Sequence, residues 1–321
     1  MGCIICGSEI RDKVLSAPCP DAPRGEIYTL AKCAGCGLVF VDPLPKTERL
    51  KDLYFYEYYG ADTGLLSKIK RFLDAFLIAR RRKKIESRKK RGSILDIGCG
   101  SGAFLNEMLG HGWDAHGVEP CDAIRLSLDI KDKIESDIDA YLAGGRKFDV
   151  ITLWYVFEHL PEPEAALRKI GALLKPDGML FLSIPDFNSY EASIGKEKWF
   201  HLDLPRHLFF FTPATISALL ARNGFAVAET NHLSWEYNFY GLFQTFYNLI
   251  GCEMNFFYKK YKWGHDFSGT MSRTRYALNL AAFYALFLPI LALSMALPFM
   301  LSAIKRTGII EVYAFKNGML K

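Results

Sequence analysis

The chain has 321 residues, of which half are hydrophobic and 23% are charged. This composition excludes a wholly disordered protein and allows a large core with more than one module. The formal net charge is +5. Residues 68–91 contain twelve Lys and Arg residues and only two acidic residues, Asp74 and Glu86, so the rest of the chain is net acidic. The charge therefore predicts one local anionic partner and disfavours a globally basic protein. We expect no secretory signal, so eight cysteines indicate a reducing compartment in which thiols serve metals or cores.

Two cysteine pairs near the start have metal-ligand spacing. Cys3-x2-Cys6 and Cys33-x2-Cys36 are each followed directly by a glycine, which lets the backbone turn beneath the sulfurs. The pattern predicts a structural zinc ribbon over residues 1–45, with these four thiolates as ligands. Two unrelated buried or redox pairs are the alternative. The module carries few basic residues and no basic–aromatic interleaving, so nucleic acid is an unlikely partner.

Residues 46–92 are interpreted as a basic amphipathic helical connector. From Leu65 to Arg91 the chain lacks Gly and Pro, and apolar residues such as Leu65, Ile69 and Phe72 recur at helical spacing. Such a helix can lie on an anionic membrane surface. The alternative is a linker helix whose apolar stripe packs on the main domain.

Residues 93–232 contain a strand, a glycine turn and a helix. Ile94–Ile97 leads into Gly98, Gly100 and Gly102, and a helix follows from Ala103. Glycines allow a ligand to approach the backbone, and Glu119, which ends the next strand, is suited to accept hydrogen bonds from ribose hydroxyls. The spacing of the glycines alone also fits a dinucleotide-binding site. Asp96 favours S-adenosylmethionine (SAM), because a carboxylate there suits a cationic ligand and repels a pyrophosphate.

Three further segments carry a family resemblance. They are Asp149–Leu160 with its Glu158-His159-Leu160, Leu173–Leu180, and Trp199–Phe211 with its Pro205-Arg206-His207-Leu208. With the glycine loop, they resemble the class I SAM-dependent methyltransferases, in particular a branch similar to the ubiquinone-biosynthesis methyltransferases with an N-terminal zinc ribbon. The third segment is similar to one in family members that act in cell-surface glycan and lipid pathways.

The resemblance implies an α/β, Rossmann-like sheet of seven strands, the last antiparallel. The strands are expected near 94–97, 114–118, 133–135, 148–153, 178–184, 225–230 and 309–316. For SAM it implies methionine contacts from Asp96, Gly98, Gly100 and Gly102, a ribose contact from Glu119 and an adenine contact from Asp137.

His159 and His207 are the candidate catalytic bases, since imidazole titrates near neutral pH. Either histidine could instead order its own loop. Asp203 and Arg206 could hold a polar or phosphorylated acceptor.

Residues 233–308 form an apolar helical insertion before the last core strand and C-terminus at 309–321. No charged residue lies between Tyr276 and Ile304, and Pro289 and Pro298 interrupt this segment. Strands on either side belong to one sheet, and basic residues flank both ends, so both ends should be cytoplasmic. We therefore predict a re-entrant or monotopic hairpin near 276–304, bent near Pro289. Two soluble core helices, or two spans formed with 237–252, are the alternatives.

These features together predict an enzyme on the cytoplasmic face of a membrane. Its expected reaction is SAM-dependent methyl transfer to a lipid, a lipid-linked acceptor or a cell-surface saccharide. The alternatives are an NAD(P)-dependent Rossmann oxidoreductase and a zinc-ribbon RNA methyltransferase or nucleic-acid binder. The sequence sets neither the acceptor atom nor the oligomeric state.

Overall fold

The computed structural model describes residues 2–19, 26–46, 49–50, 65–262 and 271–317. The chain divides into two compact units, each built from segments that are far apart in the sequence. The first, here the ribbon unit, comprises residues 1–60, 185–213 and 231–310. The second, here the sheet unit, comprises residues 61–184, 214–230 and 311–321.

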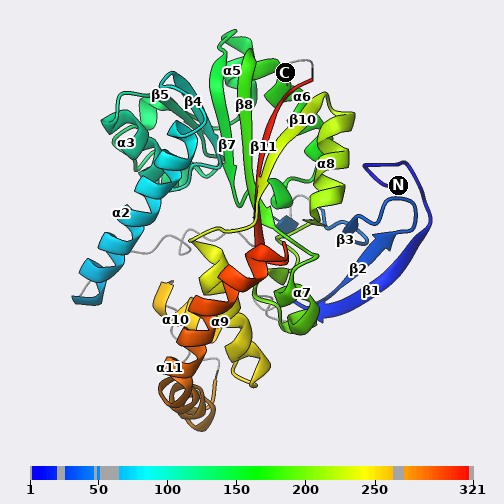
Figure 1. Ribbon diagram of the computed structural model, residues 1–321, viewed down its shortest axis with the longest axis vertical. Coiled ribbons are helices and arrows are strands. Elements are labelled where there is room, and N and C mark those ends of the chain that lie inside the picture. The colour runs from blue at the N-terminus through cyan, green and yellow to red at the C-terminus, as the bar shows by residue number, and fades with distance from the viewer. Residues whose placement is uncertain (1, 20–25, 47–48, 51–64, 263–270, 318–321) are drawn as a thin grey trace. The chain divides into compact units, whose positions relative to one another are not determined.

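The sheet unit is built on seven strands in the order β10-β11-β8-β7-β4-β5-β6. The central pairs β4–β5, β4–β7, β5–β6 and β7–β8 are parallel. Figure 1 shows β11, the last strand and drawn red, between β8 and β10. The predicted fold class and all seven strand positions are confirmed. The strands are β4 (Ser93–Ile97), β5 (Asp114–Val118), β6 (Ile134–Glu135), β7 (Phe148–Trp154), β8 (Leu174–Pro185), β10 (Phe225–Asn231) and β11 (Ile309–Lys316).

Helices α2 (Leu65–Glu86) and α3 (Ala103–Gly110) pack against the sheet through one apolar cluster. Ile85, Phe104 and Met108 meet Val150 and Phe181 there, all of them buried. Because the apolar residues of each helix recur every three or four positions, one face is committed to the core. The other helices of this unit are α4 (Asp122–Arg125), α5 (Ile138–Ala143), α6 (Pro163–Leu173) and α8 (Pro213–Arg222).

Many cations of the basic run hold α2 and the loop after it on the sheet unit. Arg82 Nε donates to Glu107 Oε1 over 2.8 Å, and Lys84 pairs with Glu311. Arg88 stacks over the Tyr313 ring at 3.9 Å. Positions 47–48 and 51–64 of the predicted connector lie outside the described residues.

The ribbon unit has its own antiparallel sheet in the order β1-β2-β3-β9. Its fourth strand comes from a distant segment, since β3 pairs Val39 with Phe210 and Phe40 with Phe209. The N-terminal module thus shares a core with residues 199–210. The strands are β1 (Arg11–Pro18), β2 (Ile27–Cys33), β3 (Val39–Val41) and β9 (Phe209–Phe210), and the short helix α7 (Tyr190–Gly195) precedes β9.

In its described residues the apolar insertion forms three helices, and here one prediction is wrong. Helices α9 (Tyr237–Leu249), α10 (Phe256–Lys262) and α11 (Arg273–Ala303) replace the predicted bent hairpin. Both Pro289 and Pro298 lie inside α11, which continues through them (Figure 1). A proline costs an interior helix about 3 kcal/mol. Packing of Ile290, Ser294 and Pro298 along one buried face offsets that cost.

Candidate functional site

The glycine loop between β4 and α3 depends on conformations that glycine tolerates best. Gly98, Gly100 and Gly102 have φ of 74°, 51° and 68°, in the left-handed region that L side chains rarely adopt. A Cβ on Gly98 would lie 2.5 Å from Val156 Cγ2. The N–H of Gly98 donates to the Val118 carbonyl over 2.8 Å, which fixes the loop against the end of β5. This is a rigid backbone cradle at the carboxyl ends of parallel strands, where α/β sheets bind ligands.

Asp96 lies in β4 directly beneath that loop and is 3% exposed. Thr152 Oγ1, on neighbouring β7, donates to Asp96 Oδ1 over 2.6 Å. Burial raises the pKa of Asp96 to about 7, although Thr152 and the charge of Arg81 act to lower it. A carboxyl group in this state gains most from a cation placed nearby.

Arg81, in α2, is a residue of this region that the sequence did not single out. Its guanidinium carbon lies 4.5 Å from the centre of a Trp154 ring and 5.9 Å from that of Tyr155. Tyr155, at the end of β7, has φ of 58°, a strained conformation that proteins often retain at functional sites. Arg81 sits within a run of five cations, and only the fold distinguishes it from its neighbours.

Glu119 connects the glycine loop to the turn that follows β5. Its Oε2 accepts from the N–H of Gly100 over 3.0 Å, and its Oε1 accepts from the N–H of Cys121 over 2.9 Å. The carboxyl is 6% exposed. Each oxygen retains a second lone pair with which it can accept a hydrogen bond from a ligand hydroxyl.

Asp137 is exposed and caps the N-terminus of α5. Its side chain accepts from the N–H of Asp139 over 2.8 Å, as N-cap residues commonly do. The adenine contact assigned to Asp137 stays a prediction.

The two candidate bases belong to different units. His159 is half-buried at the end of the short helix that follows β7, in the sheet unit. His207, in the ribbon unit, is buried, and its Nδ1 donates to the His201 carbonyl over 2.8 Å. Burial lowers the pKa of His207 to about 4, so this imidazole is neutral and weakly basic near pH 7.

Asp203 and Arg206 pair with each other beside His207. Arg206 Nε donates to Asp203 Oδ2 over 2.9 Å, and the second guanidinium arm reaches Oδ1. The guanidinium thus binds a carboxylate of its own segment with the two-pronged geometry typical of Arg.

The four predicted zinc ligands converge in the ribbon unit. Cys3 Sγ lies 3.5 Å from Cys36 Sγ, Cys6 Sγ lies 3.4 Å from Cys33 Sγ, and all four sulfurs lie within 4.8 Å of one another. A tetrahedral site with Zn–S bonds of about 2.3 Å has sulfurs about 3.8 Å apart. The glycines after each pair have φ of 75° and 80°. The donor set therefore fits zinc in both chemistry and size.

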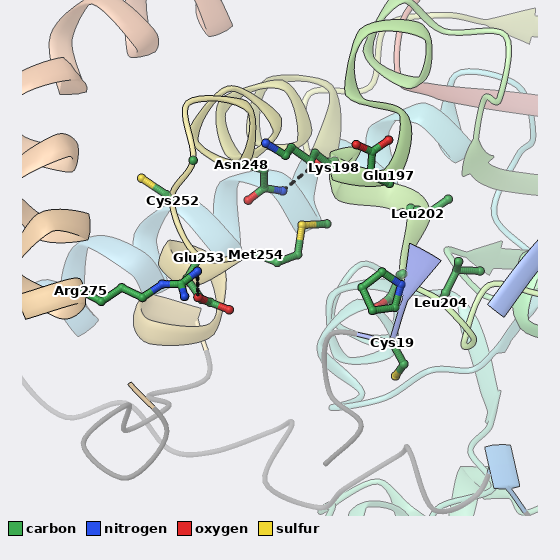
Figure 2. Close-up of a pocket in the computed structure, with 13 residues that line it drawn as sticks. Cys19, Glu197, Lys198, Leu202, Leu204, Asn248, Cys252, Glu253, Met254 and Arg275 are labelled. Atoms are coloured by element: carbon green, nitrogen blue, oxygen red, sulfur yellow. Dashed lines mark hydrogen bonds and ion pairs between the residues drawn. The ribbon is translucent and has the colours of Figure 1, made fainter. Parts of the chain in front are cut away.

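A cavity of about 490 Å³ lies within the ribbon unit. Figure 2 shows its mixed lining, with Leu202 near Glu197 and Lys198, and Leu204 also lines the cavity. The Arg275–Glu253 ion pair, 2.8 Å long, lines the same cavity. The space combines apolar and charged walls, as a site for an amphipathic molecule would.

A family comparison identifies the enzyme class. A methyltransferase domain model matches residues 65–230, which is more than half of the chain. The chain belongs to this methyltransferase family. With the seven-stranded sheet and the glycine loop, this makes it a class I SAM-dependent methyltransferase and excludes the nicotinamide alternative.

Individual relatives are distant. A ubiquinone biosynthesis O-methyltransferase of Coxiella burnetii is 31% identical over 125 residues, which is 35% of this chain and 53% of the relative. The same enzyme of Neisseria meningitidis is 29% identical over 161 residues, covering 44% and 67%. The chain thus spans about half the length of the first of these relatives. A SAM-dependent methyltransferase structure from Archaeoglobus fulgidus is 22% identical, covers 75% of this chain and 93% of its own, and superposes with a TM-score of 0.46.

Proposed function

We propose that this methyltransferase acts at the cytoplasmic face of a membrane on a lipid, a lipid-linked acceptor or a cell-surface saccharide. The observation that carries the proposal is α11, whose most apolar stretch is only 11% buried. Among the described residues it is the one helix long and apolar enough to cross a bilayer. A soluble protein rarely exposes so continuous an apolar surface without a partner.

Bound SAM would supply a methyl group on a sulfonium, a ready electrophile. We assign its binding to the cradle described above. Gly98, Gly100 and Gly102 would receive the methionine part, and Asp96 would ionise against the positive charge. Glu119 would accept from the ribose hydroxyls, and Arg81 would face the methionine carboxylate.

The protein's remaining task is to align the acceptor and remove its proton. Burial lowers the pKa of His207 to about 4, which makes it a poor proton acceptor at neutral pH, and we therefore propose His159 as the base. We propose that His207, beside the Asp203–Arg206 pair, instead orders its own segment of the ribbon unit.

We also propose that Cys3, Cys6, Cys33 and Cys36 hold one structural Zn²⁺. Since the ribbon sheet includes β9, the metal would stabilise the segment that carries His207. Metal analysis of the purified chain should find one zinc per molecule.

The acceptor class can be tested with methyl-labelled SAM and a total membrane extract. The proposal expects label in the fraction that partitions into organic solvent or in lipid-linked saccharide. Label in RNA or in aqueous protein would overturn it and favour the zinc-ribbon RNA methyltransferase.

The cofactor assignment has a matched pair of variants on α2. Arg81→Ala should weaken SAM binding about tenfold or more, as expected when a charged hydrogen bond of about 1.5–3 kcal/mol is lost. Lys83→Ala removes an exposed cation from the same helix and should leave binding unchanged. Equal effects of the two substitutions would refute the assignment.

A further inference from the structure

One face of α11 is committed to the ribbon unit. Asn279, Ile290, Ser294, Pro298 and Leu301 are buried, and their spacing places them on a single side of the helix. Rings of α9 cover this side, with the Phe243 ring centre 6.4 Å from that of Phe283 and 6.1 Å from that of Phe287.

These contacts extend along most of the helix. Near its start, Asn279 Oδ1 accepts from the N–H of Glu253 over 2.8 Å. Near its end, the Phe299 ring lies 5.8 Å from that of Trp235 and 5.6 Å from that of Phe239. The helix is therefore fastened along its length. Figure 1 shows α9 and α11 beside each other.

The opposite side is apolar and exposed. Leu288 is 73% exposed and Tyr284 is 69% exposed. Exposed Leu278, Leu293 and Met300 widen this surface toward the edge of the buried face, and exposed Ile304 follows the last turn. At about 1.5 Å per residue, α11 is about 46 Å long, and the sequence places no charge between Tyr276 and Ile304.

A transmembrane orientation of α11 conflicts with the position of residues 190–200, which are hydrogen-bonded to α9 and to the chain just after α11. The N–H of Phe200 donates to Thr245 Oγ1 over 3.1 Å, and Asn248 Nδ2 donates to the Lys198 carbonyl over 3.0 Å. At the other end, the N–H of Tyr190 donates to the Arg306 carbonyl over 2.8 Å. Residues 190–200 thus run alongside the α9–α11 pair.

That stretch includes the exposed, charged Lys196 and Glu197. A hydrocarbon layer about 30 Å thick around α11 would hold these charges and irregular backbone at membrane depth, which is costly.

Charge favours a lipid surface over a second copy of the chain. Arg273 and Arg275 precede the apolar stretch, and Lys305 and Arg306 follow it. Two such helices would bring cations together in either a parallel or an antiparallel pair. Anionic head groups attract both ends, at about 1 kcal/mol per cation.

We propose that α11 is a monotopic anchor that lies in the plane of an anionic bilayer. Its Leu278–Leu288–Met300 side enters the head-group and upper acyl region, while α9 and α10 stay on the aqueous side. This inference rests on the proposed membrane location and adds the mode of docking to it.

A depth measurement tests the proposal. A fluorescent amino acid is placed by codon suppression at Leu278, Leu288 or Met300 of the full chain. Quenching is measured on vesicles of phosphatidylcholine and phosphatidylglycerol that carry a nitroxide either near the head group or at the acyl terminus. An in-plane helix gives the same shallow depth at all three sites. A deep Leu288 site with shallow Leu278 and Met300 sites would mean a span, and no quenching together with a dimer would mean a second copy. Either result overturns the proposal.

Substitutions distinguish the apolar surface of α11 from exposed apolar residues elsewhere in the ribbon unit. Leu288→Glu and Met300→Glu should each weaken vesicle binding about tenfold, since each removes roughly one apolar side chain from the lipid. Ile10→Glu alters an equally exposed apolar residue, 71% accessible, in the same unit and should change nothing. SAM binding is recorded for each variant. If α11 still shows shallow quenching but the methyl label enters a non-lipid acceptor, only the proposed acceptor class is wrong and the docking proposal stands.

Discussion

The substitution Gly98→Ala tests the cradle most sharply, because the structure gives both costs it would incur. The new Cβ would lie 2.5 Å from Val156 Cγ2 and 3.1 Å from Val156 Cγ1. It would also hold alanine at φ of 74°. The left-handed backbone costs about 1–2 kcal/mol and overpacking about 1–3 kcal/mol. The expected loss is therefore about 2–5 kcal/mol of the free energy of unfolding.

Gly145→Ala supplies the matched control. Gly145 has φ of 65°, but a Cβ there would meet nothing within 4 Å. Gly145→Ala should lose only the part of the free energy of unfolding that comes from the left-handed backbone, about 1–2 kcal/mol. The double variant Gly98→Ala/Val156→Ala removes both methyl groups that the new Cβ meets, and it should regain the difference between the two single variants.

The assay is thermal unfolding together with calorimetric titration of SAM. Each kcal/mol should move Tm by about 2–4 °C for a domain of this size. SAM binding should fail in Gly98→Ala and be normal in Gly145→Ala. If the two single variants unfold at the same temperature, Val156 yields to the new methyl group and the reasoning is refuted.

Three other predictions follow from buried charges and thiols. Since burial raises the folded-state pKa of Asp96 to about 7, the free protein should lose stability as the pH rises from about 4 to 7 while SAM affinity increases. In Asp96→Asn, neither the urea unfolding midpoint nor the SAM affinity from calorimetric titration should change with pH in this way. If both still change as in the parent protein, the assignment is contradicted. Lys84→Met removes the ion pair that Lys84 makes with the fully buried Glu311 carboxylate and should lower the free energy of unfolding in urea by up to about 3–5 kcal/mol; Lys84→Met/Glu311→Leu should recover most of this loss, and an equally unstable double variant would refute the prediction. Cys33→Ser should abolish zinc in metal analysis and lower the Tm while SAM still binds the sheet unit; full zinc occupancy would disprove the four-thiolate site.

The family resemblance predicted the sheet unit well, and local sequence signals supported it at the cofactor loop. The short apolar run before Gly98 marked β4, because buried parallel strands read as continuous apolar segments, and the spacing of Glu119 from the glycine loop marked the end of β5. The cysteine spacing alone likewise predicted that the four sulfurs lie together. In both cases the decisive residues are neighbours in the chain.

The features that were missed depend on contacts between distant segments. Nothing around Phe209 indicates that it pairs with Phe40, and Arg81 looks like the other cations of its run. The bend predicted at Pro289 failed for the same reason. Local propensity favours a break there, but packing of α11 on α9 outweighs it.

The cofactor assignment is tested most directly by a crystal structure with S-adenosylhomocysteine bound. We expect the ribose hydroxyls to lie on the Glu119 carboxylate, the amino-acid end to lie over Gly98–Gly102, and its carboxylate to face Arg81. A nucleoside bound away from Glu119, or an amino-acid end remote from the glycine loop, would contradict it.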